Sequence, residues 1–205
     1  MLAALKTGLA ALTIDLTDIQ QQKLLDYLTL LNKWNKAYNL TAIRDPKQML
    51  PLHLLDSLSI LPYLHGTHHL DVGTGAGLPG IPLAIAKPEH HFTLLDSNGK
   101  KTRFLTHVQH QLGLTNIEVI QSRVEQYQPE QTFDTITTRA FSDLIEMVAL
   151  TKHLLAPQGI WLAMKGQLPE HELQLLAQQG LTTTPYALKV PGVDASRLAI
   201  VIKSS

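Results

Sequence analysis

The chain has 205 residues, enough for one α/β domain with a full hydrophobic core. Its 17 basic and 17 acidic residues balance, so composition alone does not indicate a nucleic-acid-binding protein. Cysteine is absent, which excludes disulfides and catalytic thiolates and makes the cytoplasm the expected location. Because no window approaches the roughly 18 apolar residues of a membrane span, we expect no membrane partner.

The first 62 residues predict helices. Residues 1–12 are small and apolar without the features of a signal peptide, so we expect a mobile or helical start. Residues 16–37 place apolar side chains at helical spacing, with Thr17 as a suitable N-cap, and residues 50–61 predict a second helix. We therefore expect residues 1–62 to form a helical extension packed on a core domain of residues 63–205.

From residue 68 onward, short apolar runs alternate with helical stretches, which is typical of a parallel α/β sheet. The last two strands are joined by only six residues, too few for a crossover helix, so they predict an antiparallel hairpin. The helices between the strands are expected at residues 81–86, 100–112, 144–154 and 170–179. The strands are expected at residues 69–73, 91–96, 117–121, 134–139, 159–165, 182–190 and 197–203.

A glycine-rich turn after the first strand predicts a nucleoside-like ligand. Gly73, Gly75 and Gly77 remove every Cβ from one side of the turn, and the following helix supplies free N–H donors. The residues from Gly75 to Gly80 also match the dinucleotide fingerprint, so a nicotinamide-dependent oxidoreductase is the alternative. Asp71 just before the turn would repel a pyrophosphate but suits the ammonium of a methionine moiety. S-adenosylmethionine is therefore the predicted cofactor.

Asp96 ends the second predicted strand, 19 residues after Gly77. An acid at the tip of the strand beside a glycine turn can accept hydrogen bonds from both ribose hydroxyls. We therefore expect Asp96 to bind the cofactor.

Two motifs of this chain are highly specific: Trp-Asn-Lys-Ala-Tyr-Asn-Leu-Thr at residues 34–41 and Gly-Leu-Pro-Gly-Ile-Pro at residues 77–82. With this pair of motifs, the sequence resembles the RsmG or GidB family of bacterial 16S ribosomal RNA guanine-N7 methyltransferases. Further matching stretches lie at residues 53–58, 71–82, 95–97, 100–105, 123–125, 139–141 and 164–166.

The resemblance implies a class I methyltransferase fold of the Rossmann-like type, with a seven-stranded sheet. It further implies methyl transfer from S-adenosylmethionine to one guanine in the decoding-region loop of 16S rRNA, on the naked RNA or the small ribosomal subunit. Carried over by motif, the cofactor-binding residues are Gly73, Leu78, Val124, Glu125 and Arg139.

The predicted acceptor atom, guanine N7, needs no deprotonation by the enzyme, because it has a free lone pair and no proton to lose. Positioning is then the main requirement, and no general base is needed. Arg139, Arg123 and Lys165 lie at the ends of neighbouring predicted strands and are our candidates for orienting the base or holding the RNA.

The basic residues near the glycine turn, Phe141 and the histidines give further predictions. Lys100, Lys101 and Arg103 are candidates for phosphate contacts, and Phe141 is expected in the core. Ten histidines include two adjacent pairs, but neighbours on a strand face opposite ways, so we predict no metal site. A non-catalytic factor that binds cofactor and rRNA without modifying the RNA stays open as a further alternative.

Overall fold

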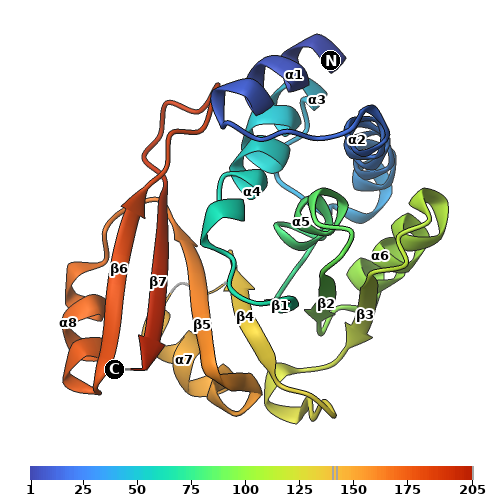
Figure 1. The fold of residues 1–205 in the computed structure, drawn as a ribbon. Helices are drawn as coiled ribbons and strands as arrows, with labels where there is room; N and C mark the ends of the chain where they lie inside the picture. The colour runs from blue at the N-terminus through green and yellow to red at the C-terminus, as the bar shows by residue number, and fades with distance from the viewer. Residues whose placement is uncertain (140, 142, 205) are drawn as a thin grey trace.

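The computed structural model describes residues 1–139, 141 and 143–204, and its centre is one seven-stranded sheet (Figure 1). The strand order is β3-β2-β1-β4-β5-β7-β6, in which β1 to β5 are parallel and β7 runs antiparallel to both neighbours. The predicted sheet and its terminal antiparallel pair are thereby confirmed. The strands are β1 His68–Val72, β2 His91–Asp96, β3 Ile117–Gln121, β4 Phe133–Thr138, β5 Leu155–Lys165, β6 Leu181–Ala187 and β7 Leu198–Ser204.

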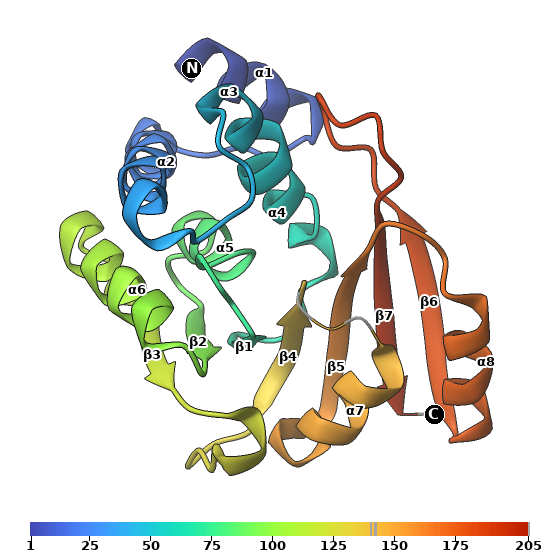
Figure 2. The same ribbon diagram turned by 180° about the vertical axis from the view of Figure 1, so that it is seen from behind.

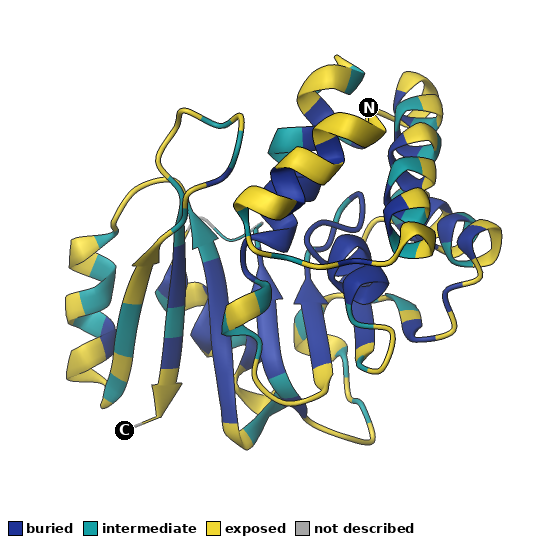
Figure 3. Cartoon of the chain, turned by 45° about the horizontal axis from the view of Figure 1, so that its top comes forward, coloured by how far each residue is buried: buried dark blue, intermediate teal, exposed yellow. Residues whose placement is uncertain are grey.

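Helices cover both faces of the sheet, as the two opposite views show (Figures 1 and 2). One apolar cluster joins α1 (Leu2–Ala11), α2 (Asp18–Tyr38), α5 (Gly80–Ala86) and α6 (Gly99–Leu112) to the sheet. A second cluster joins α7 (Leu144–Thr151) and α8 (Glu170–Gln178) to the sheet. Every residue of α5 is buried, and the central strands are almost as completely covered (Figure 3).

The second predicted N-terminal helix differs from the expectation of a single α-helix over residues 50–61. The chain forms α3 (Pro46–Met49), a π-helical turn (Leu50–Leu55), α4 (Asp56–Leu58) and a 3-10 turn (Leu61–Tyr63). Pro51 lies inside this segment and has no N–H to donate, which interrupts regular α-helical bonding. Residues 2–11 are helical, and Leu5 and Leu9 of that helix are buried.

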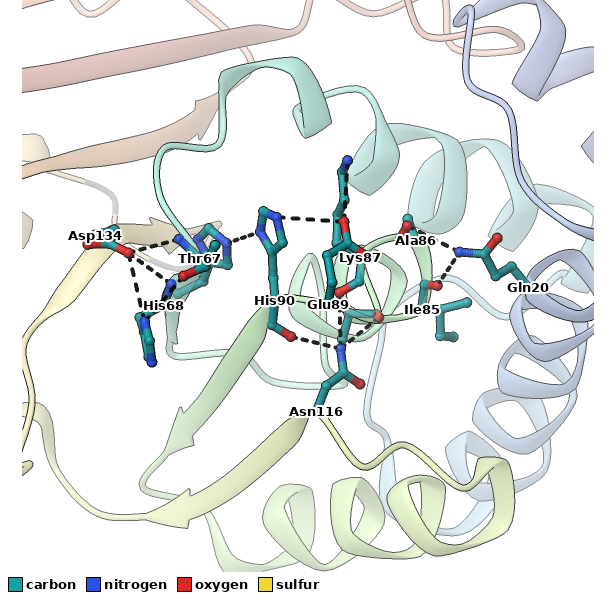
Figure 4. Close-up of polar contacts among 12 residues, drawn as sticks. Gln20, Thr67, His68, Ile85, Ala86, Lys87, Glu89, His90, Asn116 and Asp134 are labelled. Carbon is teal, nitrogen blue, oxygen red and sulfur yellow. Dashed lines mark hydrogen bonds and ion pairs between the residues drawn. The ribbon is translucent and has the colours of Figure 1, made fainter.

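Two amide side chains close the carboxyl end of α5, where a helix leaves its last carbonyl groups without partners (Figure 4). Gln20 of α2 donates to the carbonyls of Ile85 and Ala86, at 3.0 and 3.2 Å. Asn116, just before β3, donates to the carbonyls of Ala84, Lys87 and His90, at 3.0, 3.2 and 3.0 Å. The short central helix is therefore fastened to both the N-terminal helices and the sheet.

Candidate functional site: two cavities at the carboxyl edge of the sheet

The glycine turn after β1 uses its three glycines for different reasons. All three have positive φ, +64° at Gly73, +62° at Gly75 and +90° at Gly77. A Cβ at Gly77 would collide with the side chains of Ile81 and Leu105, so this glycine is required for packing. A Cβ at Gly75 would meet only the Gly73 carbonyl, at 3.9 Å. Gly75 therefore keeps the outer side of the turn open.

Asp71 braces the turn from inside, and its expected contact with a methionine ammonium stays a prediction. Its side chain is buried, and its Oδ2 accepts hydrogen bonds from the Thr74 hydroxyl at 2.7 Å and the Gly80 N–H at 2.8 Å. Burial raises the pKa of Asp71 to about 7, although both hydrogen bonds and Arg139 act to lower it. Asp71 lines neither of the two cavities described below.

Asp96 at the end of β2 also holds the turn. Its Oδ2 accepts from the Gly75 N–H and its Oδ1 from the Asn98 N–H, both at 2.9 Å, while the Lys101 ammonium lies 3.6 Å from Oδ2. Each carboxylate oxygen retains lone-pair capacity for a further donor. Binding a ribose through Asp96 stays a prediction.

The first cavity, which we call the glycine-turn cleft, has a volume of about 220 Å³ at the carboxyl ends of β1, β2 and β3. It brings together four predicted cofactor-binding residues, Gly73, Asp96, Val124 and Glu125, with Arg123 beside them. Half-buried Phe141 lines the cleft and packs on the second apolar cluster; Ala140 of the same motif lies outside the described residues. The remaining lining residues are Val72, Leu95, Ser97, Ser122 and Leu150.

Four residues of the predicted cofactor set lie outside this cleft. Leu78 is buried in the first apolar cluster, and Gly75 and Gly77 shape the turn without lining the cleft. Arg139 lines the second cavity instead. That these residues bind the cofactor stays a prediction.

The second cavity, which we call the arginine cavity, has a volume of about 320 Å³ and is built around Asp56. The Asp56 carboxylate pairs with the guanidinium groups of Arg139, at 3.3 Å, and Arg197, at 3.1 Å. Lys165 also lines it, so two of the three catalytic candidates meet here, whereas Arg123 lies in the glycine-turn cleft. The other lining residues are Ile43, Leu52, His53, Met164 and Gly166.

His53 forms one wall of the arginine cavity and is linked to the 34–41 motif. Its Nε2 hydrogen-bonds the Thr41 hydroxyl at 2.9 Å, and its Nδ1 the Leu52 carbonyl at 3.1 Å. The Asn35 side chain accepts from the Thr41 N–H at 2.9 Å and donates to the Ile43 carbonyl at 3.2 Å. Burial and the nearby Arg139 lower the pKa of His53 to about 4, so the ring is neutral at pH 7.

Lys165 is held by groups beyond the cavity. Its ammonium lies 3.7 Å from the Glu172 carboxylate and donates to the Phe141 carbonyl at 3.4 Å. The same Glu172 oxygen accepts from the Leu144 N–H at 2.6 Å, at the start of α7. The position of Lys165 is thereby coupled to α7 and α8.

Sequence reasoning missed Arg197 as a member of this site and missed its pairing with Asp56. They lie 141 residues apart, and their pairing depends on β7 lying beside β5. The available signal was an acid inside an otherwise apolar helical segment, because a buried charge demands a partner.

The described part of the chain contains no group of three or more potential metal ligands, and it has no helix long and apolar enough to cross a membrane.

Solved structures of methyltransferases share this fold. The chain is similar to magnesium protoporphyrin IX methyltransferase from Synechocystis PCC 6803, with a TM-score of 0.60, 16% identity, and coverage of 87% of this chain and 97% of that one. The chain is also similar to a SAM-dependent methyltransferase from Aquifex aeolicus, with a TM-score of 0.59, 19% identity, and coverage of 87% of this chain and 97% of that one. The fold is thus the class I fold of S-adenosylmethionine-dependent methyltransferases.

Sequence comparison narrows this class to one family. The family described as rRNA small subunit methyltransferase G matches residues 20–201. Two relatives named ribosomal RNA small subunit methyltransferase G are similar over nearly their whole lengths. The protein from Escherichia coli is 51% identical over 205 residues, which cover 100% of this chain and 99% of the relative. The protein from Shigella boydii is 52% identical over 192 residues, covering 94% and 93%. The chain belongs to the rRNA small subunit methyltransferase G family.

Proposed function

We propose that this protein transfers a methyl group from S-adenosylmethionine to N7 of one guanine in the decoding-region loop of 16S rRNA. The observation that carries the proposal is family membership over nearly the full chain, with relatives named ribosomal RNA small subunit methyltransferase G. The cytoplasm, where ribosomal RNA is found in bacteria, is the proposed location.

The glycine-turn cleft suits the cofactor. Gly73 at its edge has positive φ and no Cβ, which allows a ligand to approach the backbone. The Asp96 carboxylate and the residues Val124 and Glu125 would hold ribose and adenine, respectively, in this proposal. When bound, S-adenosylmethionine supplies an electrophilic methyl group on a sulfonium.

The arginine cavity suits the RNA side of the reaction. The cavity is lined by three cations, Arg139, Lys165 and Arg197, and by one acid, Asp56. Glu172, which pairs with Lys165, lies outside the lining, and two arginines share Asp56, so the lining favours an anionic partner. The neutral His53 has both ring nitrogens engaged, and no general base is required for N7. We propose that Arg139 and Lys165 orient the target nucleotide and that Arg123 acts at the neighbouring cleft.

The alternatives are distinguished by binding and turnover. A nicotinamide-dependent oxidoreductase is disfavoured by family membership and by the class I methyltransferase fold. A non-catalytic factor would bind S-adenosylmethionine and rRNA without transferring a methyl group, so only turnover separates it from the proposed enzyme.

The test is methyl transfer from labelled S-adenosylmethionine to naked 16S rRNA and to small subunits from a strain that lacks this methylation. We expect label at one guanine, mapped by cleavage at N7-methylguanine. Cofactor binding without label on either substrate would contradict the proposed catalysis. Failure to bind S-adenosylmethionine would contradict the assignment of the glycine-turn cleft.

A further inference from the structure

The charges of this neutral protein are segregated along the chain. Residues 27–44 and 97–117 contain six of the 17 basic residues and none of the 17 acidic residues. The first segment belongs mainly to α2 and the second mainly to α6, and these helices pack side by side (Figures 1 and 2). The six basic residues are Lys33, Lys36, Arg44, Lys100, Lys101 and Arg103.

The same two helices share an aromatic stack. The Trp34 ring lies 5.2 Å from the Tyr38 ring on α2, with an interplanar angle of 27°, and 5.0 Å from the His107 ring on α6. Trp34 also contacts the buried Phe104 at 5.6 Å, which anchors the stack in the core. Tyr38 at the outer end is 37% exposed, which leaves part of its ring available to a ligand.

This aromatic and basic surface reaches both cavities. Lys101 of α6 contacts Asp96 at the glycine-turn cleft, and Lys100 and Arg103 lie exposed on the same helix. At the end of α2, the guanidinium of exposed Arg44 donates to the Asn39 side chain at 2.8 Å. Ile43, next to Arg44, lines the arginine cavity. We call the surface formed by Tyr38, Arg44, Lys100, Arg103 and His107 the α2–α6 surface.

We propose that the α2–α6 surface binds single-stranded RNA that flanks the methylated nucleotide, with a base stacked on Tyr38 and phosphates on Arg44, Lys100 and Arg103. Aromatic side chains with interleaved cations are the arrangement that recognises unpaired nucleotides, because each base offers a π-face and each linkage a negative charge. The inference rests on the proposed function, since it assigns the RNA of that reaction to a surface outside the two cavities.

The test is binding of a fluorescein-labelled, 20-nucleotide single-stranded RNA with the sequence around the target guanine, followed by anisotropy. We expect Tyr38→Ala to weaken binding about tenfold, as loss of one stacked base does. The variant with Arg44, Lys100 and Arg103 all changed to Gln should reduce the slope of log affinity against log salt by about two. Trp34 emission should change on RNA addition in a Trp161→Phe background, where Trp34 is the sole tryptophan.

Tyr186 provides a matched control. It is 39% exposed and contacts one aromatic ring, that of Tyr63, with the ring centroids 4.6 Å apart and the planes tilted by 34°. Tyr186 lies on β6, on the other side of the molecule from α2 and α6 (Figure 1). We expect Tyr186→Ala to leave RNA affinity within about twofold of the unchanged protein. Equal effects of the two tyrosine substitutions, or an unchanged salt slope in the triple variant, would overturn the inference.

Two further outcomes separate this inference from the proposed function. If the unchanged protein methylates rRNA and the α2–α6 variants bind and methylate it equally well, the inference fails while the function stands. If the unchanged protein methylates nothing but binds RNA through Tyr38, the function fails while the assignment of single-stranded RNA to the α2–α6 surface stands. Dependence on Tyr38 only with ribosomal protein present, and never with RNA alone, would assign the surface to a protein partner and overturn the inference.

Discussion

A single buried hydroxyl joins the N-terminal helices to the glycine turn. The Tyr27 hydroxyl of α2 donates to the Ala76 carbonyl in the turn at 2.7 Å, and both residues are buried. Burial raises the pKa of Tyr27 well above its usual range, so the phenol keeps its proton and its donor role. Tyr27 is therefore a positioning residue for the turn, which it reaches from outside the sheet.

Replacing Tyr27 by Phe should lower the free energy of unfolding by about 1–3 kcal/mol, because the Ala76 carbonyl is left buried without its donor. It should also raise the dissociation constant for S-adenosylmethionine, measured by titration calorimetry, because the turn is less well held. Thr151→Val is the control, since it removes the acceptor of the buried Trp161 N–H at 2.8 Å, away from the turn. Weaker cofactor binding by both variants would refute the role of Tyr27.

A substitution of the single residue Arg197 tests whether the arginine cavity binds RNA. Its Nε lies 3.1 Å from Asp56, and its side chain is one-quarter exposed, so we expect Arg197→Gln to cost only about 1 kcal/mol of stability. The loss of one cation should raise KM for rRNA while the dissociation constant for S-adenosylmethionine stays unchanged. Lys203→Gln, at an exposed position on β7, the strand that follows Arg197, should change neither. An Arg197→Gln enzyme with wild-type kinetics would exclude Arg197 from RNA binding.

The buried His69 makes stability depend on pH. Its Nε2 bonds His90 Nδ1 at 2.7 Å, and burial, with His90 nearby, lowers the pKa of His69 to about 3 although Asp134 acts to raise it. Because the unfolded chain binds this proton near pH 6.5 and the folded one does not, stability is complete above that pH and falls as the solution is acidified.

We expect the wild type to lose about 1.4 kcal/mol per pH unit relative to His69→Gln between about pH 6 and pH 4. Urea unfolding at several pH values measures the difference. A curve for His69→Gln parallel to that of the wild type would contradict the lowered pKa of His69 in the folded protein.

At the scale of an element, the glycine turn separates a packing requirement from a binding requirement. Gly77→Ala should destabilise the protein strongly, because its Cβ would collide with Ile81 and Leu105 and its φ is +90°. Gly75→Ala should cost about 1–2 kcal/mol for its positive φ and still fold. Cofactor affinity should nevertheless fall in Gly75→Ala, because the methyl group fills the open side of the turn. Thermal melting measures the stability of the two variants, and calorimetry measures their affinity for the cofactor. Unchanged affinity in Gly75→Ala would argue against a ligand at the open side of the turn.

The elements show what the sequence alone predicts well. Runs of apolar residues bounded by turns placed the five parallel strands correctly to within a few residues, because such strands are buried on both faces. The helix over residues 50–61 was wrong in type, since apolar periodicity does not separate α from π bonding around Pro51.

Most of the glycine-turn cleft was predicted from the sequence, whereas the Asp56–Arg197 pair of the arginine cavity was not. The glycine pattern and the strand-tip position predicted Gly73 and Asp96, whereas the family resemblance predicted Val124 and Glu125. All four line one cleft, because strand tips in a parallel sheet meet at a common edge. The pairing of Asp56 with Arg197 depends on tertiary contacts over long separations, which no local pattern encodes.

At the scale of the whole molecule, the N-terminal helices share one apolar core with the helices that flank the glycine turn. Leu5, Leu24 and Leu31 are fully buried in that core, and Gln20 fastens α2 to α5. We propose that residues 1–62 are an extension on which the domain of residues 63–205 depends.

A chain of residues 63–205 alone should therefore expose the faces of α5 and α6 and fail to unfold cooperatively on heating. Circular dichroism with thermal denaturation tests this expectation. The intact protein is the control, and a cooperative transition in the shorter chain would contradict the proposed dependence.

The position of β7 between β5 and β6 has a consequence for synthesis on the ribosome. β6 is made first but has no strand to pair with until β7 arrives, and β7 also delivers Arg197 to Asp56. The nascent chain can assemble the glycine-turn cleft from β1 to β4 earlier, whereas the arginine cavity waits for the final strand. A chain interrupted before β7 is therefore left with an incomplete arginine cavity and with β5 and β6 as open edges that invite aggregation.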